Sequence, residues 1–253
     1  MTKHLIFLGA WLLGAGTSLA GTPACVPAKF KIVLDVGHTV TAPGAMSARG
    51  ATEYSFNLRL VRRIEQELRD GGFVRTTVLI TEGDRRVQLF RRSKRANAIA
   101  PDLLLSIHHD SVPQSYLETW THEGAQRSYS DRFSGYSLFI SRDMRQAKAS
   151  LAFAKLLSTE LVNRDLHFTL HYADTIRSES RVLLDRSLGV YAFDELVVLY
   201  RSRVPAVLFE AGLIVNRDDE LLLASTERQS TIAAAVHAAV VKFCERAAPS
   251  ERR

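Results

Sequence analysis

Short apolar runs alternate with segments of helical periodicity along the first half of this chain. Three runs rich in β-branched residues predict strands, because a strand buried on both faces reads as a continuous apolar stretch. They cover residues 30–36, 73–81 and 103–108. Between them, apolar residues recur at helical spacing over 53–70 and 85–99. Strand, helix, strand, helix, strand is the pattern of a mostly parallel sheet covered on both faces.

The second half continues this pattern less regularly. Further strands are predicted at 136–141, 195–199 and 206–210, and further helices at 150–162, 217–223 and 226–244. Two segments lack a clear period. We expect 111–134 to form a long loop along the ligand-binding edge, and 163–185 to be a mobile loop or a short regulatory helix. The prediction is one α/β domain over residues 21–253, with a mostly parallel twisted sheet of about six strands and helices on both faces.

The helix predicted over 85–99 has few apolar positions. Val87, Phe90 and Ile99 are expected to face the core, and its cluster of arginines and lysines is expected to face solvent.

The first twenty residues have the features of a secretory signal peptide. Lys3 provides a basic start, residues 5–16 are apolar, and Ser18-Leu19-Ala20 is a small-x-small cleavage signature. The apolar core is too short to span a bilayer, so we predict a signal peptide over 1–20, cleaved after Ala20. The alternative is an uncleaved N-terminal anchor. With cleavage, the mature protein is exported to the periplasm or the exterior and has no membrane span.

Two cysteines, Cys25 and Cys244, lie near the two ends of the mature chain. In an exported protein such a pair is compatible with a disulfide, which would close nearly the whole domain. Two free thiols are the alternative. Two cysteines so far apart in the chain do not indicate a zinc–thiolate site.

Composition and charge narrow the class of partner. With 46% hydrophobic residues the chain can bury a sizeable core. The net charge of +6 and the sequence pI of about 9.5 favour an anionic partner. No motif with interleaved stacking aromatics is present, so we do not expect a nucleic acid.

Metal-capable side chains gather where the predicted strands end. His38, His108 and Glu210 each follow or close an apolar run, and Glu53 opens a helix behind the N-cap residue Thr52. In open α/β sheets the carboxyl ends of the strands form the ligand-binding edge. Two histidines and one carboxylate are a ligand set of catalytic zinc, and a second carboxylate nearby can transfer protons. These residue types permit metal-assisted hydrolysis of an amide or ester.

Each residue also has a plainer interpretation. A histidine at a strand end is often a hydrogen-bonded loop residue, and a glutamate at a helix start often serves the helix dipole. His109 directly follows His108, so either histidine could face the site. Glu210 is the hardest to explain structurally, because burying an unpaired carboxylate is costly.

Taken in order, these residues resemble the zinc-dependent N-acetylmuramoyl-L-alanine amidases of bacterial cell walls, typified by the periplasmic cell-division amidases. The similarity extends over about residues 30–245. The stretches that carry it are Leu34-Asp35-Val36-Gly37-His38, Arg49-Gly50-Ala51-Thr52-Glu53, the segment from Thr81 to Asn97 with Arg92, the strand from Asp102 to Asp110, and Pro205 to Asn216.

The resemblance implies that His38, Glu53 and His108 bind one Zn²⁺ and that Glu210 is the catalytic general base and acid. It implies hydrolysis of the amide between the lactyl group of N-acetylmuramic acid and the L-alanine of the stem peptide. Peptidoglycan would be the partner, in keeping with the basic charge, because its stem peptides are acidic. We expect a monomer, and the lack of a recognisable wall-binding domain leaves room for a protein activator or recruiter.

Departures from the family pattern fall near the expected metal site without removing a ligand. They are Val36, Thr39, Glu82, His109, Asp110 and Leu213. Two other functions compete with the amidase. One is a zinc peptidase, but such enzymes often place His and Glu on one short loop, whereas fourteen residues separate His38 from Glu53. The other is a catalytically inactive peptidoglycan-binding regulator, which the presence of all four polar residues disfavours.

Overall fold

The computed structural model describes residues 25–173 and 181–247. The predicted signal peptide over 1–20 therefore lies outside the described residues. Within the described ranges, no helix combines the length and the apolar character needed to cross a membrane.

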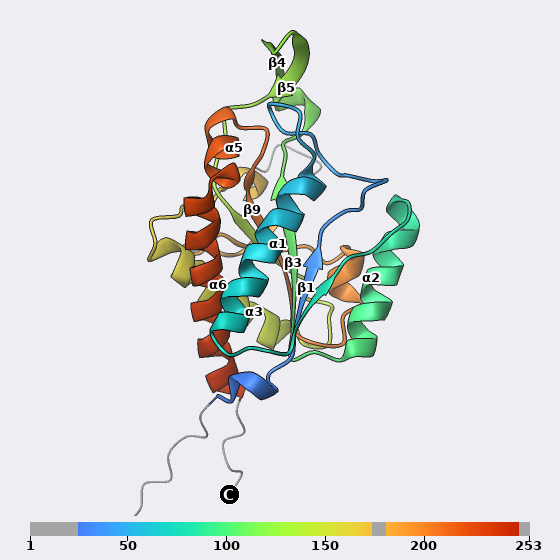
Figure 1. The fold of residues 1–253 in the computed structure, drawn as a ribbon, viewed down its shortest axis with the longest axis vertical. Helices are drawn as coiled ribbons and strands as arrows, with labels where there is room; N and C mark the ends of the chain where they lie inside the picture. The colour runs from blue at the N-terminus through green and yellow to red at the C-terminus, as the bar shows by residue number, and fades with distance from the viewer. Residues whose placement is uncertain (1–24, 174–180, 248–253) are drawn as a thin grey trace, which may run out of the picture.

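A mixed sheet forms the centre of the molecule (Figure 1). It has seven strands in the order β2-β1-β3-β9-β6-β8-β7. The strands are β1 (Ile32–Val36), β2 (Thr76–Leu79), β3 (Leu103–Asp110), β6 (Ser137–Ile140), β7 (Val182–Asp185), β8 (Val190–Ala192) and β9 (Ala206–Leu213). β2, β1, β3 and β9 are mutually parallel, whereas β6 runs antiparallel to β9 and β7 antiparallel to β8. The α/β fold class is confirmed, with one strand more than predicted.

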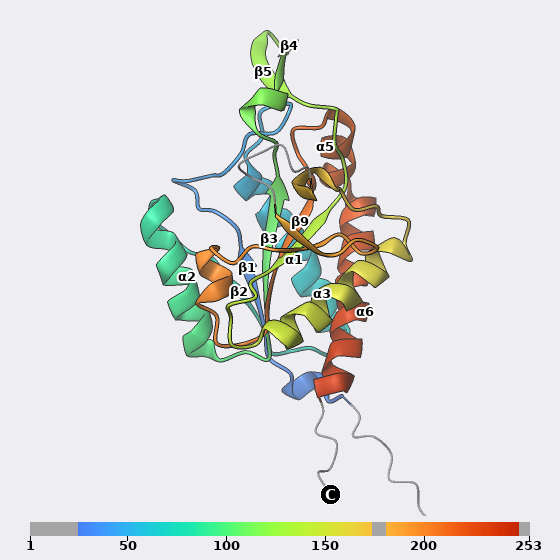
Figure 2. The same ribbon diagram turned by 180° about the vertical axis from the view of Figure 1, so that it is seen from behind.

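Helices cover both faces of this sheet (Figures 1 and 2). On one face lie α1 (Glu53–Asp70), α3 (Ala147–Val162) and α6 (Thr226–Ala247), which share the main apolar core with alternate residues of β1, β3 and β9. On the other face lie α2 (Arg85–Ile99) and α4 (Val197–Tyr200), over a smaller core. The short helix α5 (Arg217–Ala224) follows β9 and is capped by Asn216, whose side chain accepts from the backbone N–H groups of Asp218 and Asp219.

Three sequence predictions are wrong. The strand expected at 195–199 is instead the helical turn α4, so its apolar β-branched residues pack as a helix against the smaller core. The long loop expected at 111–134 contains a 3₁₀ turn, η2 (Gln114–Tyr116), and a hairpin of β4 (Glu118–His122) and β5 (Ala125–Tyr129). The hairpin projects beyond the carboxyl edge of the main sheet (Figure 1).

The third error concerns two residues of α2. Phe90, expected to face the core, is 50% exposed, with the Arg201 guanidinium 4.8 Å from its ring centre, whereas Ile99 packs against the smaller core as expected. Arg92, expected in solvent with the other basic residues, is 1% exposed, and Gln88 is 2% exposed.

The uncertain segment 163–185 contains a 3₁₀ turn, η3 (His171–Ala173), and the edge strand β7. Residues 174–180 lie outside the described part of the chain. At the end of the domain opposite the β4–β5 hairpin, Cys25 and Cys244 form a disulfide. It lies beside the 3₁₀ turn η1 (Pro27–Lys29) and the end of α6.

Candidate metal centre

His38 stands just beyond the end of β1 in an uncommon backbone conformation. Its φ angle is +66°, in the left-handed region, where a residue other than glycine is strained unless its surroundings hold it. Arg92 of α2 donates from Nη2 to the His38 carbonyl oxygen. Gly37 lets the chain pass close to β3, since a Cβ there would lie 2.6 Å from His108 Cε1 and from the Ile107 carbonyl oxygen.

Glu53 begins α1 and reaches back over the loop that follows β1. Thr52 caps the helix by accepting from Ser55 N–H at 3.3 Å, which fixes where Glu53 enters the first turn. The backbone N–H of Ala45 donates to Glu53 Oε2 at 3.1 Å, and Asn57 Nδ2 donates to Oε1 at 3.3 Å. These contacts hold a carboxylate whose side chain is only 6% exposed.

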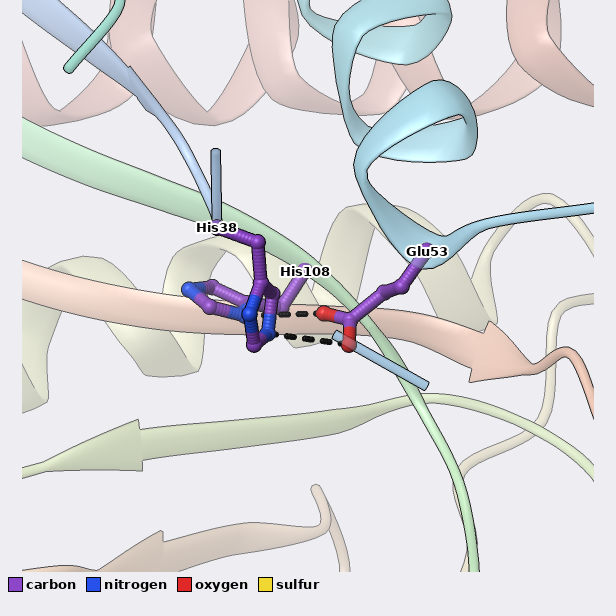
Figure 3. A group of neighbouring side chains, drawn as sticks. All are labelled: His38, Glu53 and His108. Atoms are coloured by element: carbon purple, nitrogen blue, oxygen red, sulfur yellow. Dashed lines mark hydrogen bonds and ion pairs between the residues drawn. The ribbon is translucent and has the colours of Figure 1, made fainter. Parts of the chain in front are cut away.

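His38, Glu53 and His108 converge on one point (Figure 3). Glu53 Oε2 lies 2.9 Å from His38 Nε2, and Glu53 Oε1 lies 3.0 Å from His108 Nδ1. One ligand atom from each residue lies within 4.8 Å of the other two, so the three can bind one metal ion. The structure thus brings together the three side chains that the sequence resemblance assigns to zinc, while their role as ligands stays a prediction.

The protonation states in the metal-free protein suit this arrangement. Burial alone would raise the pKa of Glu53, but hydrogen bonds from His108 and His38 outweigh it and hold that pKa well below its usual range. Burial lowers the pKa of His108, against the opposing effect of Glu53. A charged carboxylate beside a neutral imidazole is the form that binds a metal cation.

The neighbouring His109 faces away from this point. Its Nδ1 lies 2.7 Å from Asn57 Oδ1, and its ring packs 5.4 Å from the Phe56 ring, both on α1. Burial lowers its pKa to about 3, so it is neutral. Between the two histidines that the sequence left open, the structure therefore places His108 in the cluster and gives His109 a contact with α1.

Glu210 approaches the cluster from β9. It is the register partner of His108 across the parallel β3–β9 pair, so both side chains lie on the same face of the sheet. A cavity of about 500 Å³ is lined by both of them together with His38 and Glu53. Oε2 of Glu210 is buried without a hydrogen-bond partner in the described structure. Burial, reinforced by the charges of Asp110 and Glu53, raises its pKa well above the usual value.

A buried network beneath the cluster was missed in the sequence. Asp35 of β1 accepts from Ser106 Oγ at 2.7 Å and from Arg92 Nη1 at 3.3 Å, and all three residues are at most 1% exposed. Arg92 thereby links Asp35 to the carbonyl of His38. Asp35, an acidic residue inside the apolar run of β1, could have indicated this network, because a buried carboxylate needs a partner.

The turn η3 lies beside the far end of β3. Tyr172 donates from its hydroxyl to Asp110 Oδ1 at 2.9 Å, and His171 Nε2 lies 3.6 Å from Asp110 Oδ2. Tyr172 also lines a second cavity, of about 310 Å³, which shares His38, His108 and Glu210 with the first.

Known proteins resemble this chain in sequence and in fold. The sequence profile of the family described as N-acetylmuramoyl-L-alanine amidase matches residues 32–242. The chain is 25% identical over 226 residues to the N-acetylmuramoyl-L-alanine amidase AmiA of Escherichia coli (strain K12), which covers 85% of this chain and 76% of that protein.

Two solved structures have the same fold. Ami1 of Mycobacterium smegmatis, an N-acetylmuramyl-L-alanine amidase, matches with a TM-score of 0.65 at 18% identity, covering 87% of this chain and 99% of that one. The apo form of Ami1 of Mycobacterium abscessus matches with a TM-score of 0.63 at 22% identity, covering 85% and 99%.

Proposed function

Because this chain belongs to the N-acetylmuramoyl-L-alanine amidase family, we propose that it hydrolyses peptidoglycan at the amide between N-acetylmuramic acid and the L-alanine of the stem peptide. The observation that carries the proposal is the cluster of His38, Glu53 and His108 beside Glu210, at one cavity on the carboxyl edge of the parallel strands. That edge is where open α/β sheets bind their ligands.

Zinc is the cofactor that we propose for this cluster. Two imidazole nitrogens and one carboxylate oxygen suit its borderline character. In the described residues, Glu53 has no lysine or arginine partner, only the two histidines and polar N–H donors. A metal cation would supply the charge that this buried carboxylate lacks. Bound zinc supplies a Lewis acid that polarises the scissile carbonyl and lowers the pKa of water.

Glu210 is the proton carrier in the proposed reaction. It lies on the same face of the sheet as His108, and its orphaned Oε2 is available to accept a proton. As general base it takes the proton of the attacking water, and as general acid it passes that proton to the departing amine of L-alanine. Its raised pKa belongs to the metal-free protein, since a nearby cation would favour the charged carboxylate.

We infer that the reaction takes place outside the cytoplasmic membrane. The support is the predicted signal peptide over 1–20 and a substrate that is a cell-wall polymer. The net charge of +6 favours encounter with a wall rich in carboxylates. The proposal also includes a monomeric protein with room for a protein activator or recruiter.

Digestion of purified sacculi tests the proposed bond. The mature protein loaded with zinc is incubated with sacculi, and the soluble products are analysed by mass spectrometry. Release of intact stem peptides with a free L-alanine amine is the expected result. Peptides cleaved internally would indicate a peptidase, and the absence of products together with binding to sacculi would indicate an inactive regulator.

The metal assignment is tested by elemental analysis. His38→Ala should lose stoichiometric zinc, because it removes one of three ligands. His122→Ala, a histidine on the projecting hairpin, is the matched control and should keep the metal content of the wild type. Full zinc occupancy in His38→Ala would refute the ligation of His38.

A further inference from the structure

The second cavity lies on the α2 side of the sheet and has no assigned occupant. Its volume is about 310 Å³, and His38, His108 and Glu210 line both it and the larger cavity around Glu53. A group bound there would be held within reach of the proposed reaction centre. A substrate that spans both cavities would place its scissile bond beside Glu210.

The walls of this cavity are largely apolar and aromatic. Phe139 and Leu208 come from the sheet, Tyr172 from η3, and Phe193 and Leu196 from the chain before α4. The Phe139 ring packs 5.1 Å from the Tyr172 ring and 6.0 Å from the Phe193 ring. Such walls favour an uncharged group with an apolar part.

Two residues that line the α2 side of the cavity, Gln88 and Arg92, each have a buried polar atom without a partner in the described ranges. Gln88 is 2% exposed, and its Oε1 is buried without a hydrogen-bond partner among the residues that the structure describes. The Nε of Arg92 is also buried without a hydrogen-bond partner among those residues, whereas the other two guanidinium nitrogens donate to Asp35 and to the His38 carbonyl. Buried polar groups are normally paired, so an orphaned acceptor and donor at a cavity point to a ligand that supplies both partners.

The charge of the walls excludes an anionic occupant. Arg92 is the only lysine or arginine among the described lining residues, and Asp35 already neutralises it. Glu210 adds a carboxyl group. A carboxylate of the stem peptide would therefore enter without a free cation to pair with, which is costly in an apolar cavity.

We propose that this cavity binds the 2-acetamido group of the muramic acid residue, with Gln88 as a specificity-determining residue; the inference rests on the proposed amidase function. The acetamido group branches from the ring carbon next to the one that bears the lactyl ether, so it lies a few bonds from the scissile amide. Its N–H can donate to Gln88 Oε1, its carbonyl can accept from Arg92 Nε, and its methyl group can contact the aromatic wall.

Size separates this group from the other branches near the scissile bond. The lactyl methyl and the L-alanine methyl each fill about the space of one water, roughly 30 Å³, and have no polar atom for Gln88. An acetamido group fills about 100 Å³ on the same scale and leaves room for the adjoining ring carbons. It is the one uncharged branch that matches both the volume and the orphaned polar atoms of the cavity.

The test compares hydrolysis of two muramyl peptides that differ only at this branch, one N-acetylated and one N-deacetylated. The wild type should prefer the acetylated substrate by roughly 10- to 100-fold in kcat/KM, the range expected when buried hydrogen-bonding groups lose their partners. Gln88→Leu should lose most of this preference by slowing hydrolysis of the acetylated substrate. Gln66→Leu, the same change on the exposed face of α1, should keep it.

Equal kcat/KM for the two substrates in the wild type would overturn the proposal, and so would an undiminished preference in Gln88→Leu. The wild-type comparison needs no substitution, so poor folding of the variant cannot shield the proposal. Failure of the amidase assignment gives a different result, because neither substrate would then release its stem peptide.

Discussion

Glu210 is the residue on which the proposed chemistry depends most. Glu210→Gln keeps the size and the buried position of the side chain but removes proton transfer. We expect it to bind zinc stoichiometrically and to release stem peptides about 10²- to 10⁴-fold more slowly. Elemental analysis and release of peptides from sacculi measure the two effects. Activity close to that of the wild type would refute the assigned role.

Arg92 is expected to position His38 through the backbone. Its guanidinium pairs with Asp35 and donates to the His38 carbonyl, at a residue whose φ is +66°. Arg92→Lys keeps a charge for Asp35 but loses the planar fork that binds both groups. Zinc affinity, measured by competition with a chelator, should fall about 10- to 100-fold.

The matched control for Arg92 lies on the same helix. Arg95 is exposed and donates to the Ile80 carbonyl, so Arg95→Lys should leave zinc affinity unchanged. A thermal unfolding curve checks that Arg92→Lys is folded. If the folded variant bound zinc as tightly as the wild type, Arg92 would be a structural residue only.

His171 should make the metal-free protein sensitive to mild acid. Burial lowers its pKa from 6.5 to about 4, so the folded protein holds this ring neutral at pH 7. Below pH 6.5 the unfolded chain binds a proton that the folded protein does not. The free energy of unfolding therefore falls as the pH drops from about 6.5 towards 4, by up to about 3 kcal/mol for this residue.

A ring without a titratable group isolates this effect. His171→Phe keeps the contact with the Phe133 ring, and urea unfolding at pH 7 and pH 5 should show a smaller difference than in the wild type. His122→Phe on the hairpin should retain the full difference. The same pH dependence in His171→Phe and the wild type would contradict the prediction.

The sequence predicted the candidate site residues better than it predicted the contacts around them. Strand ends and a helix start were sufficient to propose His38, Glu53 and Glu210 as neighbours. The choice between His108 and His109 was open, because successive strand residues face opposite sides and a register irregularity lies between His108 and Asp110. Arg92 was missed because helical periodicity places an arginine in solvent, whereas here a buried acid holds it.

Among the secondary-structure elements, the parallel core was predictable and its antiparallel additions were not. The ranges of α1 and α2 agree with prediction because cap and stop signals frame them. The hairpin of β4 and β5 was read as a loop because most of its residues are polar, and its few apolar and aromatic residues, Trp120, Ala125 and Tyr129, are too sparse to give a clear alternation. The segment of α4 was predicted as a strand because its valines favour strands. Packing against the smaller core outweighs that propensity and makes it a helical turn.

The N-terminal cap of α1 links local structure to the metal centre. Thr52→Ala removes the side-chain acceptor for Ser55 N–H and should lower the free energy of unfolding by about 1 kcal/mol. Urea unfolding measures the change. Thr119→Ala, at an exposed position of β4, should cost much less. Equal losses in the two variants would show that the cap contributes nothing specific.

For the whole molecule, the arrangement separates stability from chemistry. The candidate metal centre occupies the carboxyl edge of the parallel strands, whereas the Cys25–Cys244 disulfide lies at the other end, where both ends of the described chain meet (Figure 1). The sequence placed the two cysteines near the two ends of one domain, but it did not decide between a disulfide and two free thiols. That outcome depends on where α6 ends relative to the start of β1, which only the packing of α6 on α1 and α3 determines.

Loss of the disulfide should therefore lower stability and leave catalysis intact. The bond joins residues 219 positions apart, and closing so long a loop stabilises the folded state by about 5 kcal/mol in the chain-entropy model, with strain reducing that figure. The Cys25→Ala/Cys244→Ala double variant should have a Tm lower by about 10 °C, at the 2–4 °C per kcal/mol expected for a domain of this size. Zinc content and the rate of stem-peptide release at 25 °C should match the wild type, because the chain leading into β1 is still held by Phe30, whose ring packs against those of Phe73 and Phe243. A reductant should lower the Tm of the wild type to that of the variant and leave the variant unchanged. An unchanged Tm in the double variant would show that the disulfide does not stabilise the fold. A loss of zinc in that variant would show that the two ends of the domain are not independent.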